Sequence, residues 1–223
     1  RPKKPNKLGV TVLDELDLTE VRKYIDWTPF FMTWQLSGKY PKILQHELIG
    51  EEATNLFNDA NAMLDDVINN KKITAKAVFG LFPANSSVDD IILYQDDERS
   101  DSLMTLHQLR QQSKKPAGQF NRCLADYVAS TESNVADYLG AFAVSSGFGA
   151  DALGKIYDAD NDTYNSILLK AVADRLAEAS AEYLHEKVRK EYWGFAEDED
   201  FSNESLIREQ YQGIRPAPGY PAC

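Results

Sequence analysis

The chain has 223 residues, of which 43% are hydrophobic and 11% aromatic, and its formal net charge at pH 7 is −11. This length and apolar content suit one large domain or two small ones with a buried core, and they exclude a disordered chain. The acidic excess repels nucleic-acid phosphates and anionic lipid headgroups, so we expect no nucleic acid and no membrane as a partner.

The first residues, Arg1-Pro2-Lys3-Lys4-Pro5-Asn6-Lys7, have the composition of an interdomain connection. We therefore expect residues 1–8 to be a linker from a preceding domain and residues 9–223 to form one domain. The chain stops at Pro221-Ala222-Cys223, within a loop-like segment. From this we expect the domain to be truncated at its C-terminus.

Helical signals dominate the first third of the chain. A short helix is predicted from Thr19 towards Ile25, with Glu20 in its positively polarised first turn. Residues 26–34 are rich in aromatic side chains, and Pro29 suits the first turn of a second helix. Residues 50–69 are predicted to form an amphipathic helix, because apolar side chains recur there every three or four positions.

Strand signals follow in one block. Residues 75–82 and 91–94 are predicted to form a hairpin, because residues 83–90 supply turn-forming side chains between them. Residues 103–109 are ambiguous between strand and helix. Further strands are expected at residues 124–128 and 138–144, and Gly147 and Gly149 end this pattern.

The longest predicted helix covers residues 163–193, with Asp162 as its cap. A short helix is expected at residues 203–211, after Ser202. The strands therefore occur together and are flanked by helices, without regular alternation. This order predicts an α+β fold with an antiparallel sheet.

The segment that begins at Arg215 is the first candidate binding element. Prolines at 216, 218 and 221 fix their own φ angles and hold the preceding residues extended, so the loop is stiff without secondary structure. Gly219 allows a turn or a close approach to a ligand. The Arg215 guanidinium suits a carboxylate. A plain connector is the alternative interpretation.

Acidic side chains supply the other candidates. Asp174 and Glu178 are four residues apart and share one helix face, and Glu182 continues their row. They can bind a cation or simply form a solvated helix edge. Asp26 precedes Trp27 in the aromatic segment, where it can cap a helix or accept a hydrogen bond from an ammonium group.

Several kinds of chemistry lack a sequence signal. The three histidines have no metal-ligand spacing, no CxxC pair exists, and no nucleophile elbow, Walker A loop or GxGxxG is present. Two cysteines fit a reducing compartment, so we expect a cytoplasmic protein. Two clusters of basic side chains are candidate docking patches for an acidic partner protein: Lys3, Lys4 and Lys7, and Lys187, Arg189 and Lys190.

Five stretches together resemble the activation domain of cobalamin-dependent methionine synthases. They are Tyr24-Ile25-Asp26-Trp27-Thr28-Pro29-Phe30-Phe31, Gly80-Leu81-Phe82-Pro83-Ala84-Asn85, Ala173-Asp174-Arg175-Leu176-Ala177-Glu178-Ala179, Tyr192-Trp193-Gly194, and Tyr211-Gln212-Gly213-Ile214-Arg215-Pro216-Ala217-Pro218-Gly219-Tyr220-Pro221-Ala222-Cys223. The resemblance spans nearly the whole chain, and the last stretch is the most specific.

This resemblance implies an α+β fold, with a curved helical body around an antiparallel sheet. It also implies a domain of a methyltransferase, the cobalamin-dependent 5-methyltetrahydrofolate–homocysteine S-methyltransferase of methionine biosynthesis. Such a domain binds S-adenosylmethionine, which remethylates cobalamin held by a neighbouring domain of the same polypeptide. The electron comes from flavodoxin or a flavoprotein reductase. We do not expect the fragment alone to turn over.

The same resemblance implies roles for seven residues. Asp26, Glu178, Arg215, Ala217 and Gly219 match S-adenosylmethionine contacts, and Tyr220 and Asp174 match positions that face cobalamin. No catalytic side chain is expected, because reduced cobalamin is itself the nucleophile. Two other hypotheses stay open: a helical interaction module without ligand chemistry, and an independent methyltransferase. The second lacks the glycine-rich strand-to-helix turn typical of such enzymes.

Overall fold

The structure is a computed structural model, and it describes residues 1–217. Helices surround one antiparallel sheet of five strands, which confirms the predicted α+β class. The short elements are α1 (Leu18–Val21), α2 (Trp27–Thr33), α6 (Asn203–Ile207) and the 3-10 helices η1 (Arg22–Tyr24), η2 (Lys42–Gln45), η3 (Leu124–Tyr127) and η4 (Thr131–Ser133).

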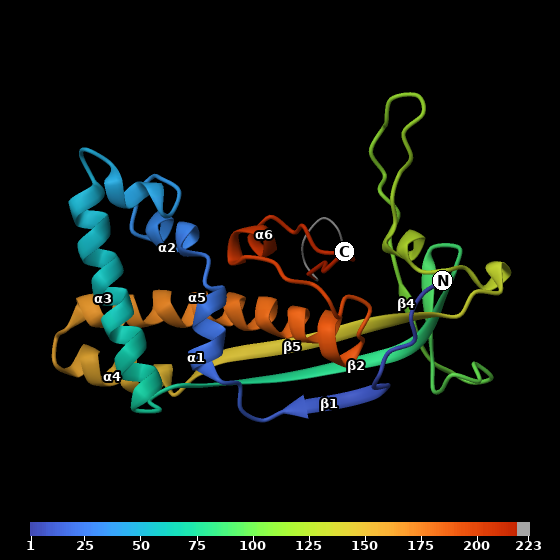
Figure 1. Cartoon of the computed structure of the whole chain (residues 1–223), viewed down its shortest axis with the longest axis horizontal. Coiled ribbons are helices and arrows are strands. Elements are labelled where there is room, and N and C mark those ends of the chain that lie inside the picture. Colours follow the sequence, from blue (N-terminus) through green and yellow to red (C-terminus); the bar gives the residue numbers. More distant parts are fainter. Residues whose placement is uncertain (218–223) are drawn as a thin grey trace.

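Strand β2 (Thr74–Ser87) is the centre of the sheet. One of its edges pairs along most of its length with β5 (Asp137–Phe148). The other edge pairs first with β1 (Gly9–Leu13) and then with β3 (Asp90–Tyr94), which pairs in turn with β4 (Ser102–His107). The long β2–β5 ribbon connects the helical end of the molecule to the end that carries β3 and β4 (Figure 1).

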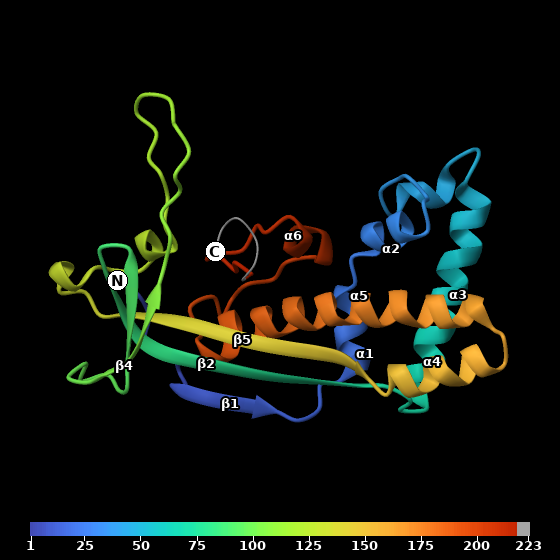
Figure 2. The same ribbon diagram turned by 180° about the vertical axis from the view of Figure 1, so that it is seen from behind.

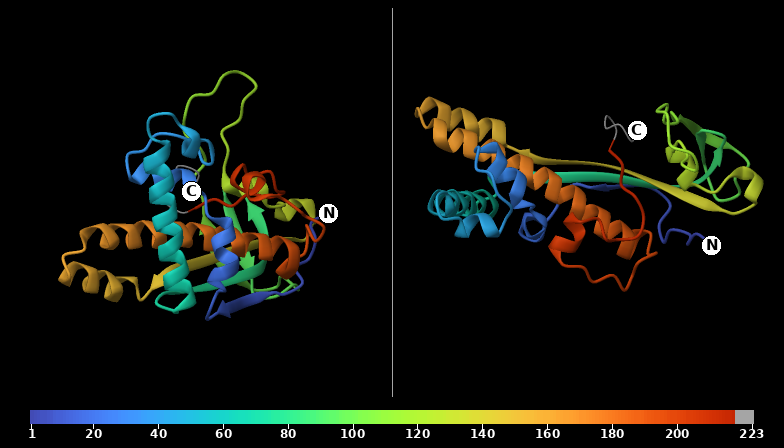
Figure 3. Two further views of the ribbon diagram at one scale, coloured as in Figure 1. Left: turned by 60° about the vertical axis from the view of Figure 1, so that its left-hand side comes forward. Right: turned by 90° about the horizontal axis from the view of Figure 1, so that it is seen from above.

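Three longer helices pack around this ribbon. Helix α5 (Thr163–Lys187) runs along the ribbon, and a π-helical turn, η5 (Val188–Tyr192), extends it (Figure 2). Helix α3 (Gly50–Asn69) crosses α5 near one end of α5. Helix α4 (Ala150–Ala159) lies antiparallel beside α5 (Figure 3). Among the described residues, no helix is long and apolar enough to cross a membrane.

The main core lies between α3, α5 and one face of β2. Alternate residues of β2 turn towards the helices, and Phe79 and Leu81 are each 1% exposed. Helix α5 presents apolar side chains at helical spacing, including Leu168 and Leu176. Because α5 is fixed along its whole length, its polar side chains are held at defined positions.

The predicted hairpin is confirmed, because β2 and β3 pair antiparallel, but its turn is shorter than predicted. Residues 83–87 do not belong to the turn, because β2 continues to Ser87 and Pro83 lies opposite Tyr138 of β5. Only Val88 and Asp89 lie between β2 and β3. The strand predicted at residues 124–128 was wrong. Residues 124–127 form η3, whose start is stabilised by the Asp126 carboxylate accepting from the Cys123 amide at 2.9 Å.

Other boundaries also differ from the predictions. β1 and α4 were not predicted, and residues 103–109 are mainly strand β4. The final helix ends at Ile207 instead of residue 211, and the regular part of α5 ends at Lys187. Helix α6 is short because an isolated helical turn gains little stability from helix propensity alone.

The N-terminal residues are attached to the body of the domain. The Lys7 amide donates to the Tyr192 carbonyl at 3.1 Å, and the Trp193 indole donates to the Lys3 carbonyl at 2.8 Å. Lys3 and Lys4 form ion pairs with Glu197 and Asp97. Residues 3–7 therefore follow the turn after η5.

Candidate functional site

The segment after α6, residues 211–217, lies across the C-terminal half of α5 (Figures 1 and 2). Its first anchor is Tyr211, which is 7% exposed. The Tyr211 ring covers the Arg189 guanidinium, 4.1 Å from its carbon to the ring centroid, and meets the His185 ring edge-on at 4.8 Å. This cation–π contact fixes where the segment leaves α6.

Its second anchor is Arg215. The Arg215 Nη2 atom donates to Oε2 of Glu182 on α5 at 2.9 Å. Glu182 is 8% exposed, so the pair is largely removed from water. The segment that carries the predicted carboxylate-binding arginine is thus attached to the long helix at both ends.

Arg189 lies beneath both anchors and is completely buried. Its Nε donates to both carboxylate oxygens of Glu199 at 3.1 and 3.2 Å, and its Nη1 bonds to His185 Nδ1 at 2.6 Å. The positive charges of Arg189 and Arg215 are therefore balanced by the negative charges of Glu182 and Glu199. Burial of four ionised groups is tolerated only where each is paired in this way. We call Glu182, His185, Arg189, Glu199, Tyr211 and Arg215 the buried ion cluster.

Burial shifts the pKa values of three members of this cluster, Tyr211, Glu182 and His185, and it raises that of Tyr211. It raises the pKa of Glu182, against the opposing effect of Arg215 and Arg189. It lowers the pKa of His185 to about 3, and the two neighbouring guanidiniums act in the same direction. His185 is therefore neutral at physiological pH, and its Nδ1 accepts the hydrogen bond from Arg189.

Asp26 is the N-cap of α2. Its Oδ1 accepts from the Thr28 amide at 2.9 Å, which confirms the capping interpretation. The residues before Asp26 contact α5 and α6: Tyr24 packs edge-on against Tyr183 at 5.5 Å, and Asn203 of α6 donates to the Ile25 carbonyl at 3.2 Å. No hydrogen bond joins Asp26 to Arg215 among the described residues.

Of the candidate carboxylates of α5, Asp174 and Glu178 are exposed, whereas Glu182 is buried. Asp174 pairs with the adjacent Arg175 at 2.6 Å. Glu178 lies one turn before Glu182 on the same row, and no ion pair within residues 1–217 involves it. Ala217 is exposed at the end of the described chain. The remaining two predicted residues, Gly219 and Tyr220, lie outside the described residues.

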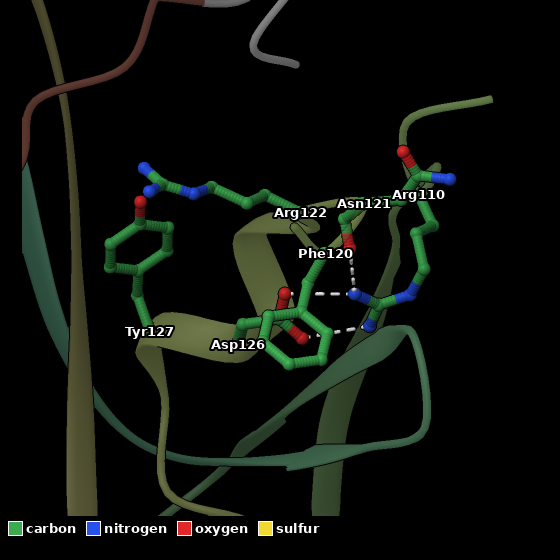
Figure 4. A pocket seen from close by; sticks show the side chains of 6 residues that line it. All are labelled: Arg110, Phe120, Asn121, Arg122, Asp126 and Tyr127. Atoms are coloured by element: carbon green, nitrogen blue, oxygen red, sulfur yellow. Dashed lines mark hydrogen bonds and ion pairs between the residues drawn. The ribbon is translucent and has the colours of Figure 1, made fainter. Parts of the chain in front are cut away.

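Hollows elsewhere contain none of the predicted site residues. The first, of about 450 Å³, lies at the base of the loop between β4 and η3, where Arg110 pairs with Asp126 (Figure 4). The second, of about 440 Å³, lies beside the N-terminal half of α3 and is also lined by Trp34, which follows α2, and by Tyr164 at the start of α5. Among the described residues, no group of three His, Cys, Asp or Glu side chains has the arrangement of a metal site.

The assignment of Arg189 to a basic docking patch was wrong, because Arg189 is buried. Lys3, Lys4, Lys187 and Lys190 each form an ion pair with an acid of the same chain, and their docking role stays a prediction.

Sequence reasoning also missed most of the buried ion cluster. A usable signal was the spacing of Glu182, His185 and Arg189, which places them at intervals of three and four on one helix face. Their position beside the apolar stripe of α5 indicated burial. Their partners Glu199 and Tyr211 come from a later segment and share no local pattern with them.

Comparison with known proteins adds two findings. A family model described as "Vitamin B12 dependent methionine synthase, activation domain" matches residues 17–223. A solved structure, "Crystal Structure of the MetH Reactivation Domain bound to AdoHcy", is 56% identical, with a TM-score of 0.96. That likeness covers 100% of this chain and 68% of the related chain.

Proposed function

Since this chain belongs to the activation-domain family of vitamin B12-dependent methionine synthases, we propose that it binds S-adenosylmethionine for the reductive reactivation of cobalamin. The observation that carries this proposal is the related domain, which is described as bound to AdoHcy and is 56% identical to the whole chain. AdoHcy is S-adenosylmethionine without the transferred methyl group, so a site for one has the shape needed for most of the other.

Arg215 is the proposed partner of the ligand carboxylate. Its Nη2 is held by Glu182, while its Nε is buried and has no hydrogen-bond partner within residues 1–217. An unpaired buried donor is unfavourable, so an anionic ligand that reaches the guanidinium would be stabilised there. The described residues therefore fit the amino-acid end of S-adenosylmethionine.

The cationic groups of the ligand need acceptors. We assign the ammonium and sulfonium groups to Asp26 and Glu178, and the backbone contacts to Ala217 and Gly219. Asp26 has one oxygen occupied by the Thr28 amide, which fixes the carboxylate and leaves the other oxygen for a ligand. Glu178 lies one helical turn, about 6 Å, from the residue that holds Arg215.

Cobalamin held by a neighbouring domain of the same polypeptide would, in its reduced form, supply the nucleophile for the methyl group. This chain's task is then to orient the sulfonium methyl and exclude water from it. Tyr220 and Asp174 are the residues that we propose to face cobalamin. The exposed carboxylate of Asp174 fits this role, because the adjacent Arg175 is its only ion-pair partner in the described part of the chain.

We propose that the Asp174 carboxylate accepts a hydrogen bond from an imidazole side chain of the neighbouring domain, once that imidazole no longer binds cobalamin. Replacing Asp174 with Asn should slow reactivation of the full synthase without weakening S-adenosylmethionine binding. An equal loss of binding would contradict this role.

The wider proposal is a cytoplasmic methyltransferase of methionine biosynthesis, the 5-methyltetrahydrofolate–homocysteine S-methyltransferase. Flavodoxin or a flavoprotein reductase would supply the electron. The alternative function is a helical interaction module without ligand chemistry, which the exposed part of α5 would equally allow.

Calorimetric titration with S-adenosylmethionine separates the two functions, using the chain and the synthase polypeptide that contains it. We expect binding that weakens by roughly tenfold or more in Arg215→Ala, since a charge-assisted hydrogen bond contributes about 1.5–3 kcal/mol. Arg208→Ala is the matched control, because Arg208 only forms an exposed pair with Glu204. Absence of binding, or binding unaffected by Arg215→Ala, would favour the interaction module.

A further inference from the structure

Glu182 lies between two guanidinium groups. Its Oε2 accepts from Arg215 at 2.9 Å, and its Oε1 is 3.9 Å from Nη1 of Arg189. The Glu182 side chain is 10% exposed, and its Oε1 has no hydrogen-bond partner among the described residues. A buried carboxylate with an unused acceptor is costly, so its contact with Arg215 accounts for much of its stabilisation.

We propose that Glu182 is a positioning residue, which holds the Arg215 guanidinium in the orientation that binds the carboxylate of the ligand's amino-acid end. This inference rests on the proposed function, in which Arg215 binds that carboxylate. Glu182 itself does not contact the ligand; it acts through Arg215.

The need for such a residue follows from the segment that carries Arg215. Residues 208–217 belong to no helix or strand. A free arginine loses about 2 kcal/mol of side-chain entropy when it is fixed, and a bound ligand would have to offset that loss. The contact with Glu182 orders the side chain before the ligand arrives, which favours binding.

Glu182 is able to hold Arg215 because it is itself fixed. It projects from the C-terminal part of α5, and Arg189 faces it from the next turn but one. Arg189 in turn is held by Glu199 and His185 on its other sides. The contact therefore rests on the buried ion cluster and not on a mobile surface side chain.

Tyr211 restricts the same segment from its other end. Its ring lies on Arg189, four residues before Arg215. Gly213, between them, has a φ angle of +102°, which side chains other than glycine rarely adopt. The backbone thus turns between two fixed points, and the direction of the Arg215 side chain is set by Glu182.

The test compares ligands with and without a carboxylate. Dissociation constants are measured for S-adenosylmethionine and for decarboxylated S-adenosylmethionine, which lacks only that group. The proteins are the synthase polypeptide with its natural sequence and the variants Glu182→Gln, Arg215→Ala and the double variant. Glu186→Gln is the matched control, because Glu186 lies one turn further on the same row and pairs with Lys190 at 3.4 Å.

Glu182→Gln preserves the shape of the side chain and removes its charge. We expect it to weaken S-adenosylmethionine binding by about fivefold to tenfold and to leave binding of the decarboxylated ligand within about twofold. In the double variant, we expect an affinity equal to that of Arg215→Ala alone, because residues that act through one another are not additive. Glu186→Gln should bind both ligands as the natural sequence does.

Three results would overturn the inference: unchanged binding in Glu182→Gln, an equal loss for both ligands, or additive losses in the double variant. Failure of the proposed function is seen separately, as natural protein that does not bind S-adenosylmethionine or as Arg215→Ala that binds it normally. A loss in Arg215→Ala without a loss in Glu182→Gln would contradict only the positioning role.

Discussion

The guanidinium carbon of Arg189 lies 4.1 Å from the centroid of the Tyr211 ring, and both side chains are buried. This contact joins the π-helical end of α5 to the segment that leads to Arg215. The ring also separates Arg189 from solvent, so the ion pair with Glu199 stays in a medium of low polarity.

Removal of the Tyr211 ring should therefore be costly. We expect Tyr211→Ala to lower the free energy of unfolding by about 3–4 kcal/mol, since the loss of a buried aromatic side chain is combined with exposure of Arg189. Tyr211→Phe keeps the ring and should cost less than about 1 kcal/mol. Urea unfolding measures both values. An equally large loss in Tyr211→Phe would assign the stabilisation to the hydroxyl group instead.

Asp26 is expected to have two separable roles. Asp26→Asn retains a capping oxygen for the Thr28 amide and should leave the melting temperature nearly unchanged, whereas Asp26→Ala should lose about 1 kcal/mol of stability. Both variants remove the negative charge, so both should weaken S-adenosylmethionine binding. Normal ligand affinity in Asp26→Asn would show that Asp26 is only a helix cap.

Alanine substitutions at two glycines of α4, one at its N-cap and one in its interior, should change stability in opposite directions. Gly149, the N-cap of α4, has a φ angle of +98°, and an added Cβ would lie 2.5 Å from the Lys72 carbonyl oxygen. We expect Gly149→Ala to cost about 2 kcal/mol or more. Gly154 lies inside α4 with open space around it, so Gly154→Ala should stabilise by up to about 1 kcal/mol. Thermal unfolding of the two variants compares them; destabilisation by Gly154→Ala would argue against the position of α4.

His185 should make stability depend on pH. Its pKa is lowered from 6.5 to about 3 by burial, so the unfolded chain binds this proton more tightly than the folded one. The resulting stability is complete above pH 6.5 and is lost progressively as the pH falls towards 3. His185→Gln keeps an acceptor for Arg189 and does not titrate.

Unfolding free energies between pH 7.5 and 4.5 test this expectation. The natural chain should lose more stability over that range than His185→Gln does, and Glu182 contributes equally to both. His46→Gln, at an exposed position, should follow the natural chain. Parallel pH profiles for the natural chain and His185→Gln would show that His185 is not the titrating group.

The sequence patterns predicted what depends on local periodicity. The helix at residues 50–69 and most of the helix after Asp162 were recognised because apolar side chains recur on one face. The strands were placed less well, since Pro83 was taken as a turn residue although it lies within β2. Its ring is tolerated because neighbouring strands determine the position of β2, an influence that a local pattern does not contain.

In the candidate site, too, local features could be predicted from the sequence and tertiary contacts could not. Asp26 as a helix cap follows from its neighbours in sequence. The proposed carboxylate-binding role of Arg215 is based on the chemistry of its guanidinium group. The pairing of Arg215 with Glu182 joins residues 33 positions apart and was not predicted. Arg189 was even assigned to an exposed patch, because only tertiary structure shows that Glu199 and Tyr211 bury it.

A crystal structure of the domain with S-adenosylhomocysteine would test the central proposal most directly. We predict that the ligand carboxylate binds the Arg215 guanidinium, that the Arg215–Glu182 contact is retained, and that the ammonium group lies near Asp26 or Glu178. A ligand bound elsewhere, for example in the hollow beside Arg110, would contradict the assignment of this site.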